Sequence, residues 1–576
     1  MKIETMRHSL AHIMALAVQE LYPGTKLGMG PAIENGFYYD FYLPKSLNQE
    51  DLPQIEKRMK KLLEENIVFI KKEVDKRKAK EIFKDQPYKL AMIEEMKGKI
   101  NIYESGRFAD LCKGPHIRST KQITKDAFKL LKVAGAYWKG DEKNQMLTRI
   151  YAAAFETKKD LENFLKIQKE AEKRDHRILG KQLELFLIDE EFGKGLILWS
   201  PKGAILQKIV MDFALNAYLE KGYQLVTTPH IANLDLWKRS GHWDFYRENM
   251  YPPMRVEDEY FVIKPMNCLG HVKIYNSKIR SYKNLPLRFT EMGTVYRYEK
   301  SGVLHGLARV RGFTQDDAHI FCTPEQLQKE LLNIIDLTSF IFKTFGFKEF
   351  RVSLSVKDSR KKKKYLGDEK TWELAERALE KTLKVKNLAY TRYPGEAVFY
   401  GPKIDLLVKD AIGRDWQLTT IQVDFNFPEK FEMYYIDKKG RKKKPIMIHR
   451  ALLGSLERFI GVLIEHYGGA FPLWLAPEQI WLIPVGSRHR KHAREGGKIL
   501  KEKGFRIKVR DEAETVSRKI RKGEIQKIPY MLVIGDKEVK TKSVRIRQRG
   551  KGDIGILKLE KFIKKAGKEI EKRQMF

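Results

Sequence analysis

The sequence predicts an α+β protein built from several domains. Its 576 residues, at roughly 150 residues per domain, correspond to three or four domains. The chain is 42% hydrophobic and 32% charged, so it holds enough apolar side chains for several cores, and wholesale disorder or a fibrous repeat is excluded. Strand-like alternation and helix-like periodicity are both present, and the last block alternates the two.

The first block, residues 1–155, contains short alternating strands among helices. GFYYDFY and KINIYESGRFADL are predicted to be strands of this kind, and TRIYAAAF is expected to close the block. Residues 156–187 are charged and carry apolar residues every three to four positions, which indicates a surface helix that joins two domains.

The middle block, residues 188–472, is long and mixed. It opens with the helix AILQKIVMDFALNAYLEKGY and the strand QLVTTPHI, and glycine-punctuated strands follow. The segment PIMIHRALLGSLERFIGV near its end is predicted to be a helix, with Gly454 and Gly461 in it. The lysine run Lys361–Lys364 is predicted to be a solvated loop or a helix end.

The last block, residues 473–576, alternates two kinds of element. Strand IWLIPV, helix KHAREGGKILKEKG, strand RIKVRD, helix TVSRKIRKGEIQ and strand YMLVIG follow in order, and a basic tail ends the chain. This alternation predicts a small α/β unit with a mostly parallel sheet.

Several classes of protein are excluded by composition. No run of eighteen apolar residues is present, so no transmembrane helix is expected, and charges interrupt the N-terminus where a signal peptide needs an apolar core. Three cysteines, Cys112, Cys268 and Cys322, cannot build a disulfide framework. We therefore expect a soluble protein of the reducing cytoplasm, with Cys322 in a core.

The net charge indicates a polyanionic partner. Lys and Arg number 111 against 75 Asp and Glu, a formal net charge of +36. RNA, DNA and nucleotides are the usual partners of such a surface, because neutralised phosphates release counterions. Residues 477–576 carry 29 basic and 13 acidic residues, which concentrates the charge there. The alternative is an organism whose proteins are all rich in lysine.

Arginines gather around one strand–loop–strand segment, residues 289–321. Arg297, Arg309 and Arg311 lie within it, and guanidinium groups present forked donors to phosphate. Gln315, Asp316, Asp317 and His319 follow directly, so cation-binding groups accompany the anion-binding ones. A surface ion-pair network is the alternative for the arginines, and a helix whose Arg458 reaches solvent is the alternative for the segment after His449.

Motifs along the whole chain carry a family resemblance. KPMNCLGH, RVRGFTQDDAHIFC, FYGPKID, RDWQ, HRALLGSLERF and AEKRDHRILG are all similar to the threonyl-tRNA synthetase family of class II aminoacyl-tRNA synthetases. The segment ending in Pro229 resembles motif 1, residues 289–321 resemble motif 2, and residues 447–461 resemble motif 3.

The resemblance implies an architecture. It places an α+β editing domain in residues 1–155, a linker in 156–187, a class II catalytic core on an antiparallel sheet in 188–472, and an α/β anticodon-binding domain in 473–576. A homodimer around the motif 1 helix is expected. The small N-terminal TGS-type domain that usually precedes the editing domain is expected to be absent.

The resemblance also implies a reaction. ATP and threonine would give threonyl-adenylate, and the threonyl group would pass to tRNA. Arg297 would contact the ATP α-phosphate and Arg458 the γ-phosphate, as the catalytic pair, with Mg²⁺ bound to the ATP. The remaining ATP-binding residues would be Arg309 near the phosphates, Glu299 near the adenine, and Gln417.

Zinc is implied only by the resemblance. Cys268, His319 and His449 are 51 and 130 residues apart, so spacing favours a buried thiol and core histidines. The family match makes them ligands of one Zn²⁺ per subunit, with an open position for the amino group and hydroxyl of threonine. Asp317 is the expected partner of that hydroxyl, and the pocket would be completed by Gln315, Tyr400 and Gln422.

A second cluster lies in the first block. His8 and His12 stand four apart, and Cys112 and His116 form a second pair, so spacing alone resembles a four-ligand metal site. The family match implies instead a metal-free site that removes serine from mischarged tRNA, to which Lys89 and Asp110 would belong. Proofreading is expected because serine lacks only one methyl group of threonine. A structural role is the alternative.

The resemblance also implies two anticodon-binding residues, and the sequence departs from the family pattern at two further places. Glu538 and Arg547 correspond to residues near the anticodon bases, with surface solvation as the alternative. NCLGH replaces the usual NCPGH, so Leu269 is expected to loosen a turn. Leu418 and Thr419 stand where cysteine and glycine are common, and Leu418 is expected to line the adenylate pocket.

Two rival hypotheses remain at this stage. A non-catalytic RNA-binding paralogue would keep the fold, but it would not need all five of the residues that this chain retains, namely Arg297, Arg458, Cys268, His319 and His449. A synthetase of changed specificity is the second rival, and Leu418 is the residue that favours it.

Overall fold

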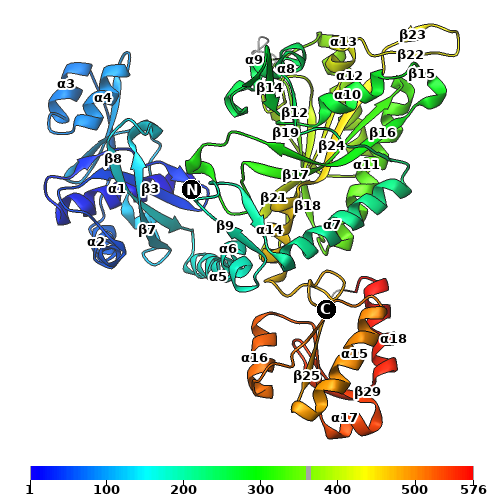
Figure 1. Ribbon diagram of the computed structural model, residues 1–576. Coiled ribbons are helices and arrows are strands. Elements are labelled where there is room, and N and C mark those ends of the chain that lie inside the picture. The colour runs from blue at the N-terminus through cyan, green and yellow to red at the C-terminus, as the bar shows by residue number, and fades with distance from the viewer. Residues whose placement is uncertain (1, 359–364, 575–576) are drawn as a thin grey trace. The chain divides into compact units, whose positions relative to one another are not determined.

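The computed structural model describes residues 2–358 and 365–574, and the lysine run at 361–364 lies outside the described residues. The chain forms two compact units, Met1–Lys169 and Glu170–Phe576 (Figure 1). In the described ranges, no helix has the length and the apolar composition that crossing a membrane requires.

The first unit is built on an antiparallel sheet with the order β1-β3-β8-β7, and β2 pairs with β3. GFYYDFY and TRIYAAAF are strands as predicted, and α1 packs a fully buried stretch against the sheet. A second sheet, β4-β5-β6, contains the predicted strand segment KINIYESGRFADL, which forms two antiparallel strands, β5 and β6. The bounds are α1 (Ile3–Leu21), β1 (Lys26–Leu27), β2 (Ala32–Ile33), β3 (Gly36–Tyr42), α2 (Leu52–Glu64), β4 (Phe69–Val74), α3 (Lys76–Ile82), α4 (Pro87–Glu95), β5 (Ile100–Ser105), β6 (Phe108–Leu111), β7 (Phe128–Tyr137) and β8 (Met146–Ala154).

The second unit is centred on an eight-stranded sheet with the order β11-β16-β17-β24-β21-β20-β18-β19. The five inner pairings are antiparallel, and only the two edge pairings are parallel. An antiparallel core sheet is therefore confirmed. The bounds are β11 (Gln224–Leu225), β16 (Leu287–Tyr296), β17 (Gly312–Cys322), β18 (Phe350–Val356), β19 (Tyr390–Pro394), β20 (Lys403–Lys409), β21 (Asp415–Asp424) and β24 (Ile446–Ser455).

The two faces of this sheet are covered differently. Ile320 and Ile448 belong to one core cluster with residues of α7, α11, α12 and α14, whereas Phe321 and Met447 belong to a second cluster with α8, α10 and α13. Successive side chains of a strand point to opposite faces, so this division follows the pleat. The bounds are α7 (Pro201–Glu220), α8 (Leu234–Ser240), α10 (Cys268–Asn276), α11 (Pro324–Thr344), α12 (Glu369–Val385), α13 (Asn426–Lys430) and α14 (Leu456–Tyr467).

The prediction of a helix for PIMIHRALLGSLERFIGV is half wrong. Residues 446–455 form the central strand β24, and the helix α14 begins only at Leu456, with Ser455 as its cap. Eight consecutive residues of β24 are buried because both faces of the sheet are covered. Such a strand reads as a continuous apolar run, which periodicity cannot separate from a buried helix.

Two other elements differ from the prediction. The linker is not one helix but two, α5 (Lys158–Arg174) and α6 (His176–Gln182), because Asp175 leaves the helical conformation and caps α6. QLVTTPHI is strand only at its ends, in β11 and in β12 (Ile231–Asn233), which pairs with β14 (Glu259–Ile263) in a small sheet completed by β13 (Met254–Val256).

The last block forms a mixed sheet with the order β26-β25-β27-β28-β29. The first three strands are parallel, as predicted, but β27-β28 and β28-β29 are antiparallel. The predicted basic tail is folded, because its apolar residues Val544, Ile546 and Phe562 enter the core. The bounds are β25 (Ile480–Pro484), α15 (Arg490–Glu502), β26 (Ile507–Val509), α16 (Val516–Ile525), β27 (Tyr530–Ile534), α17 (Asp536–Thr541), β28 (Ser543–Gln548), β29 (Gly552–Lys558) and α18 (Leu559–Glu571).

A buried carboxylate maintains an irregularity in the central sheet. Gln315 pairs with Ser455 but Asp317 pairs with Ala451, so β24 has two extra residues at this point. Asp316, 1% exposed, accepts the backbone N–H groups of residues 452–454 at 2.8–3.1 Å and the Tyr218 hydroxyl at 2.6 Å. The carboxylate thus satisfies backbone donors that the strand ladder leaves unpaired.

Replacing Asp316 by alanine tests this role. The substitution leaves three backbone N–H groups without their acceptor and the buried Arg450 guanidinium without its ion-pair partner, so the second unit is expected to lose about 3–5 kcal/mol of unfolding free energy. Asp316→Asn, which keeps one acceptor oxygen, is expected to lose less. Urea denaturation followed by circular dichroism measures both, and a loss below about 1 kcal/mol for Asp316→Ala contradicts the assignment.

Candidate active site

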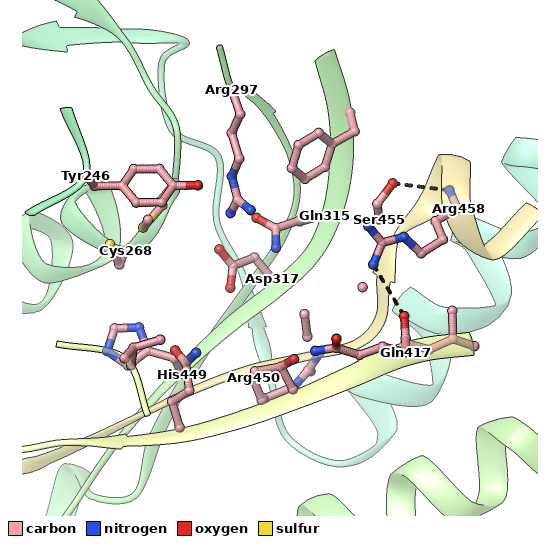
Figure 2. Close-up of a pocket in the computed structure, with 18 of the residues that line it drawn as sticks. Tyr246, Cys268, Arg297, Gln315, Asp317, Gln417, His449, Arg450, Ser455 and Arg458 are labelled. Carbon is pink, nitrogen blue, oxygen red and sulfur yellow. Dashed lines mark hydrogen bonds between the residues drawn. The ribbon is translucent and has the colours of Figure 1, made fainter. Parts of the chain in front are cut away.

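A cavity of about 510 Å³ lies over the central strands of the eight-stranded sheet (Figure 2). Its walls come from β17, β21 and β24, the segment after β16, and the first turns of α10 and α14. All twelve residues that the sequence analysis connected with ATP, threonine or zinc line this one cavity.

Strand register explains how residues far apart in sequence meet. His319 pairs directly with His449, and His449 pairs with Gln422 on the next strand, so the three form one row across β17, β24 and β21. Asp317 lies two residues before His319 and therefore on the same face. The even-numbered neighbours Asp316 and Ala318 face the opposite core.

One end of the cavity is strongly cationic. Arg297 follows β16, with its guanidinium 5.1 Å from the centre of the Phe313 ring, and Arg458 lies in the first turn of α14. Burial lowers the pKa of Arg458, and the charges of Arg297 and Arg309 lower it further. The positive charges of these guanidinium groups repel one another, so an anion placed among them is stabilised.

Glu299 and Gln417, the other two predicted ATP-binding residues, contact these arginines. Glu299 pairs with Arg309 at 2.9 Å, and the carbonyl of Gln417 lies 3.4 Å from Arg458 Nη1. Arg458 Nε donates to the Ala308 carbonyl at 2.9 Å. The cationic end is therefore attached to the loop between β16 and β17, whose residues 305–309 precede β17.

The opposite end carries carboxylate, hydroxyl and imidazole groups. The Tyr400 hydroxyl donates to Gln422 Oε1 at 2.6 Å, and Asp317 Oδ2 accepts from Asn267 Nδ2 at 3.1 Å. Burial raises the pKa of Asp317. Cys268, at the first residue of α10, and Gln315 complete this end, which can present both acceptors and donors to a small polar ligand.

Buried partners determine which ring nitrogens of the two histidines are available. His271 Nε2 lies 3.2 Å from Glu291, so its Nδ1 accepts the Nδ1–H of His319 at 2.8 Å and leaves Nε2 of His319 without a proton. His449 Nε2 donates to Asp424 at 2.9 Å, which leaves its Nδ1 lone pair available. Such partners are typical of metal-binding histidines.

The donor set therefore fits zinc in its chemistry. One thiol and two imidazoles with available lone pairs are common zinc ligands. Burial raises the pKa of the Cys268 thiol well above its ordinary value, so a thiolate there needs a bound cation. The three donors are nevertheless more widely spaced than a coordinated set: among the described residues, donor groups with all atoms within 4.8 Å are His8, His12, Cys112 and His116, and Asp175, His176 and Glu465.

The departures from the family pattern fit the fold. Position 269 is not in a turn but in the first helical turn of α10, where Leu269 is 2% exposed and packs in the core. Leu418 lines the cavity, as predicted, and it is the extra residue where the pairing of β20 with β21 shifts. The Thr419 hydroxyl donates to the Leu452 carbonyl at 2.6 Å.

A second cavity, of about 490 Å³, lies in the first unit. Five of the six predicted editing residues line it, and His116 lies behind Cys112, with its Nε2 3.2 Å from Sγ. Cys112 Sγ is also 3.1 Å from His8 Nε2. Lys89 and Asp110 form a buried ion pair of 2.5 Å, and His12 Nε2 is 3.5 Å from Asp110.

This second cluster is electrically neutral apart from the ion pair. Burial, with the neighbouring histidines, lowers the pKa of His116 to about 2, and burial raises the pKa of Cys112 to about 11. Burial also lowers the pKa of His8 and of His12. The imidazoles are therefore uncharged at neutral pH and can accept hydrogen bonds from a polar ligand or a water molecule. The thiol keeps its proton there and is not a nucleophile.

The two predicted anticodon residues, Glu538 and Arg547, have separate partners in the structure. Glu538 is 7% exposed and accepts the Gly535 N–H at 3.0 Å as part of the cap of α17. Arg547, on β28, lies 3.7 Å from Glu524. In the ranges that the structure describes, no hydrogen bond or ion pair connects Glu538 with Arg547.

Sequence reasoning missed the residues that support the site. Asn267, His271 and Asp424 each contact a predicted ligand-binding side chain. Glu291 in turn holds His271. Asn267 and His271 stand inside the motif KPMNCLGH, so their signal was present beside Cys268. Glu291 and Asp424 lie in strands and carry no such local signal.

Comparison with known proteins assigns the class. Residues 251–467 match the model "tRNA synthetase class II core domain (G, H, P, S and T)" and residues 479–569 match "Anticodon binding domain". Residues 100–151 match "Threonyl and Alanyl tRNA synthetase second additional domain". The antiparallel sheet with its arginine-lined cavity is thus the core of a class II tRNA synthetase.

Similarity over nearly the whole chain narrows the class. A threonine–tRNA ligase of Dehalococcoides mccartyi is 52% identical, over 95% of this chain and 93% of its own length, and one of Thermotoga neapolitana is 50% identical, over 99% and 89%. The crystal structure of the RNA-binding domain of threonyl-tRNA synthetase from Cryptosporidium parvum Iowa II superimposes with a TM-score of 0.65 at 40% identity, covering 68% of this chain and 98% of that one. The chain belongs to the threonine–tRNA ligase family.

One buried acid beside the cationic end titrates near neutral pH. Glu457, 4% exposed, accepts the Thr314 N–H at 3.0 Å and the Ser455 hydroxyl at 3.1 Å, and it attaches the start of α14 to β17. Burial raises the pKa of Glu457 to about 7.

This acid predicts a pH dependence of stability. Between about pH 4.5 and 7 the unfolded chain has lost the Glu457 proton and the native chain has kept it, so the unfolding free energy falls as pH rises, by about 3 kcal/mol in total. Glu457→Gln is expected to remove this fall. Urea midpoints from pH 4.5 to 8 for both proteins measure the difference, and parallel curves contradict the assignment.

Proposed function

We propose that the protein is a threonine–tRNA ligase that activates threonine with ATP and transfers it to tRNA. The observation that carries the proposal is the single cavity with three arginines at one end and a thiol, two imidazoles and Asp317 at the other. A triphosphate and a small hydroxyl-bearing amino acid match these two ends. Class II core, anticodon-binding and additional-domain matches support the same activity.

In this proposal the arginines stabilise charge during adenylation. The threonine carboxylate attacks the α-phosphate, a bond forms between them, and pyrophosphate leaves. Arg297 would contact the α-phosphate, and Arg458 with Arg309 would hold the leaving phosphates, with Mg²⁺ bound to the ATP. Glu299 and Gln417 would complete the ATP site. Fixed guanidinium groups need no reorganisation when the charge develops, which is why their attachment to buried carbonyls favours catalysis.

Zn²⁺ would be held by Cys268, His319 and His449. When bound, it supplies a Lewis acid that the amino group and hydroxyl of threonine can ligate. Asp317 would accept the proton of the threonine hydroxyl in a hydrogen bond, with Gln315, Tyr400 and Gln422 around it. Valine has the shape of threonine without the hydroxyl, so it would leave the buried Asp317 without the hydroxyl partner, and a site of this kind rejects it strongly.

ATP–pyrophosphate exchange tests the ligase directly. We expect exchange with threonine, weak exchange with serine and none with valine, and we expect a strong zinc chelator to abolish it. Arg458→Lys loses the forked contact and is expected to lower kcat/KM at least tenfold. Exchange with none of the three amino acids would overturn the ligase in favour of an RNA-binding paralogue.

The cavity of the first unit is proposed to hydrolyse seryl-tRNA. Serine lacks one methyl group, which discriminates by only about 1–3 kcal/mol, so the synthetic site would pass some of it. The neutral imidazoles of His8 and His12 and the Lys89–Asp110 pair, together with Cys112 and His116, would bind the ester and position a water molecule. The low pKa of His116 supports a role for this ring as an uncharged hydrogen-bond acceptor.

Deacylation of seryl-tRNA distinguishes the cavity of the first unit from the cavity of the second unit. His8→Ala is expected to slow deacylation of seryl-tRNA at least tenfold, because it removes a ring that lines the cavity, and to leave threonine-dependent exchange unchanged. Lys97→Ala, an exposed residue at the same cavity, serves as the matched control. Equal deacylation by His8→Ala and the native protein would remove the first unit from the editing assignment.

Other partners complete the proposal. The basic last block would bind the anticodon region of the tRNA, with Glu538 and Arg547 near its bases. Exposed apolar side chains on α7 and β11, namely Ile205, Leu219 and Leu225, support a homodimer through this region. Three free cysteines support a cytoplasmic location.

A further inference from the structure

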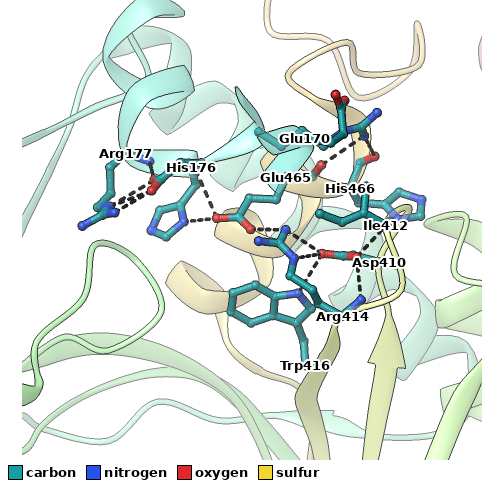
Figure 3. Close-up of polar contacts among 11 residues, drawn as sticks. Glu170, His176, Arg177, Asp410, Ile412, Arg414, Trp416, Glu465 and His466 are labelled. Carbon is teal, nitrogen blue, oxygen red and sulfur yellow. Dashed lines mark hydrogen bonds and ion pairs between the residues drawn. The ribbon is translucent and has the colours of Figure 1, made fainter. Parts of the chain in front are cut away.

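His176 is buried at the start of α6 and lies outside both cavities described above. The side chain is 1% exposed and contacts Glu465 on α14 (Figure 3). It also contacts the loop at 305–309. Its Nε2 accepts the backbone N–H of Leu307 at 2.9 Å. Since that N–H can only donate, Nδ1 carries the ring proton and donates to Glu465 Oε1 at 2.6 Å.

The Glu465 end of this connection is held rigidly. Oε1 of Glu465 also accepts the backbone N–H of His176 at 3.1 Å, and its other oxygen pairs with Arg414. Arg414 is in turn held by Asp410, whose Oδ2 lies 2.7 Å from Arg414 Nε and 3.1 Å from Trp416 Nε1. Glu465 thus restrains the His176 ring from the α14 side, and Arg414, Asp410 and Trp416 support Glu465 in a chain of contacts (Figure 3).

The loop at 305–309 lies directly against the other side of the His176 ring. Residues 305–309 form a tight loop, in which the His305 and Arg309 backbones are hydrogen-bonded at 3.1 and 3.2 Å. Gly306 has a φ of +50°, and a Cβ there would lie 2.1 Å from His176 Nε2. The glycine therefore allows the loop backbone to lie directly on the ring. Leu307 is fully buried.

The same loop carries the cationic end of the cavity. One residue after Leu307, the Ala308 carbonyl accepts from Arg458, and the next residue is Arg309. Arg458 and Glu465 both belong to α14. The loop is thus attached to α14 twice, directly through Arg458 and indirectly through His176 and Glu465.

We propose that His176 is a positioning residue for ATP binding. By accepting the Leu307 N–H, it sets the loop at 305–309 and so places Arg309 and Arg458 for the triphosphate. The inference rests on the proposed adenylation function. It predicts that the Nε2 contact with the loop matters for ATP, beyond any contribution of the buried ring to folding.

Two amide substitutions separate the two ring nitrogens. In His176→Asn the amide nitrogen replaces Nδ1 and still donates to Glu465, but nothing accepts the Leu307 N–H. In His176→Gln the longer side chain brings its oxygen to the place of Nε2, which preserves the loop contact and loses the one to Glu465. Lys181→Ala, an exposed residue of the same helix, is the control.

The measurement is threonine-dependent ATP–pyrophosphate exchange with the full chain, at varied ATP and varied threonine. His176→Asn is expected to raise KM for ATP about tenfold with KM for threonine within about twofold, and His176→Gln and Lys181→Ala are expected to stay within about twofold of the native values. An unchanged KM for ATP in His176→Asn, or an equal rise in His176→Gln, overturns the proposal in favour of a packing role.

Two further measurements keep the outcome interpretable. Calorimetric titration with ATP alone reports binding without turnover, so a native protein that binds ATP but shows no exchange rejects the ligase function and leaves the positioning test intact. Where His176→Asn fails to fold, Gly306→Ala, which displaces the ring from the loop side, is expected to raise the dissociation constant for ATP about tenfold, and an unchanged constant overturns the proposal.

Discussion

The register of three neighbouring strands, β17, β24 and β21, is the constraint on which the site depends. It places His319, His449 and Gln422 in one row and Asp317 two residues away on the same face. Asp316 maintains that register from the opposite face, because its carboxylate accepts the N–H groups of the two extra residues in β24 and their neighbour. A shift of one residue would turn every one of these side chains into the core.

Electrostatics then divides the cavity into two ends. Guanidinium groups that disfavour one another make the first end complementary to phosphate, whereas the thiol, the two proton-free imidazole nitrogens and a buried carboxylate make the second end complementary to a cation and a polar ligand. The neutral cluster of the first unit is the opposite case, since burial keeps its imidazoles and thiol uncharged.

Sequence reasoning found residues that line the cavity and missed those that hold them in place. Sequence motifs located Arg297, Asp317 and His449, and the alternation of apolar residues located strands such as GFYYDFY. Residues 446–455 were misassigned because a strand covered on both faces has no alternation. The partnerships of His176 with Leu307 and Glu465 join residues 131 and 289 positions apart, and no local pattern reports such contacts. The part of Glu538 in the cap of α17 was not predicted either.

Binding of a stable threonyl-adenylate analogue tests the central claim, that one strand register brings a phosphate site and a hydroxyl-reading site into a single cavity. Calorimetry with the zinc-loaded chain compares the threonyl analogue with its valyl counterpart, which has the same shape and lacks the hydroxyl. The account predicts one threonyl analogue per chain and valyl binding at least about a thousandfold weaker, because the hydroxyl partners are left unpaired. Equal affinity for the two analogues would contradict it.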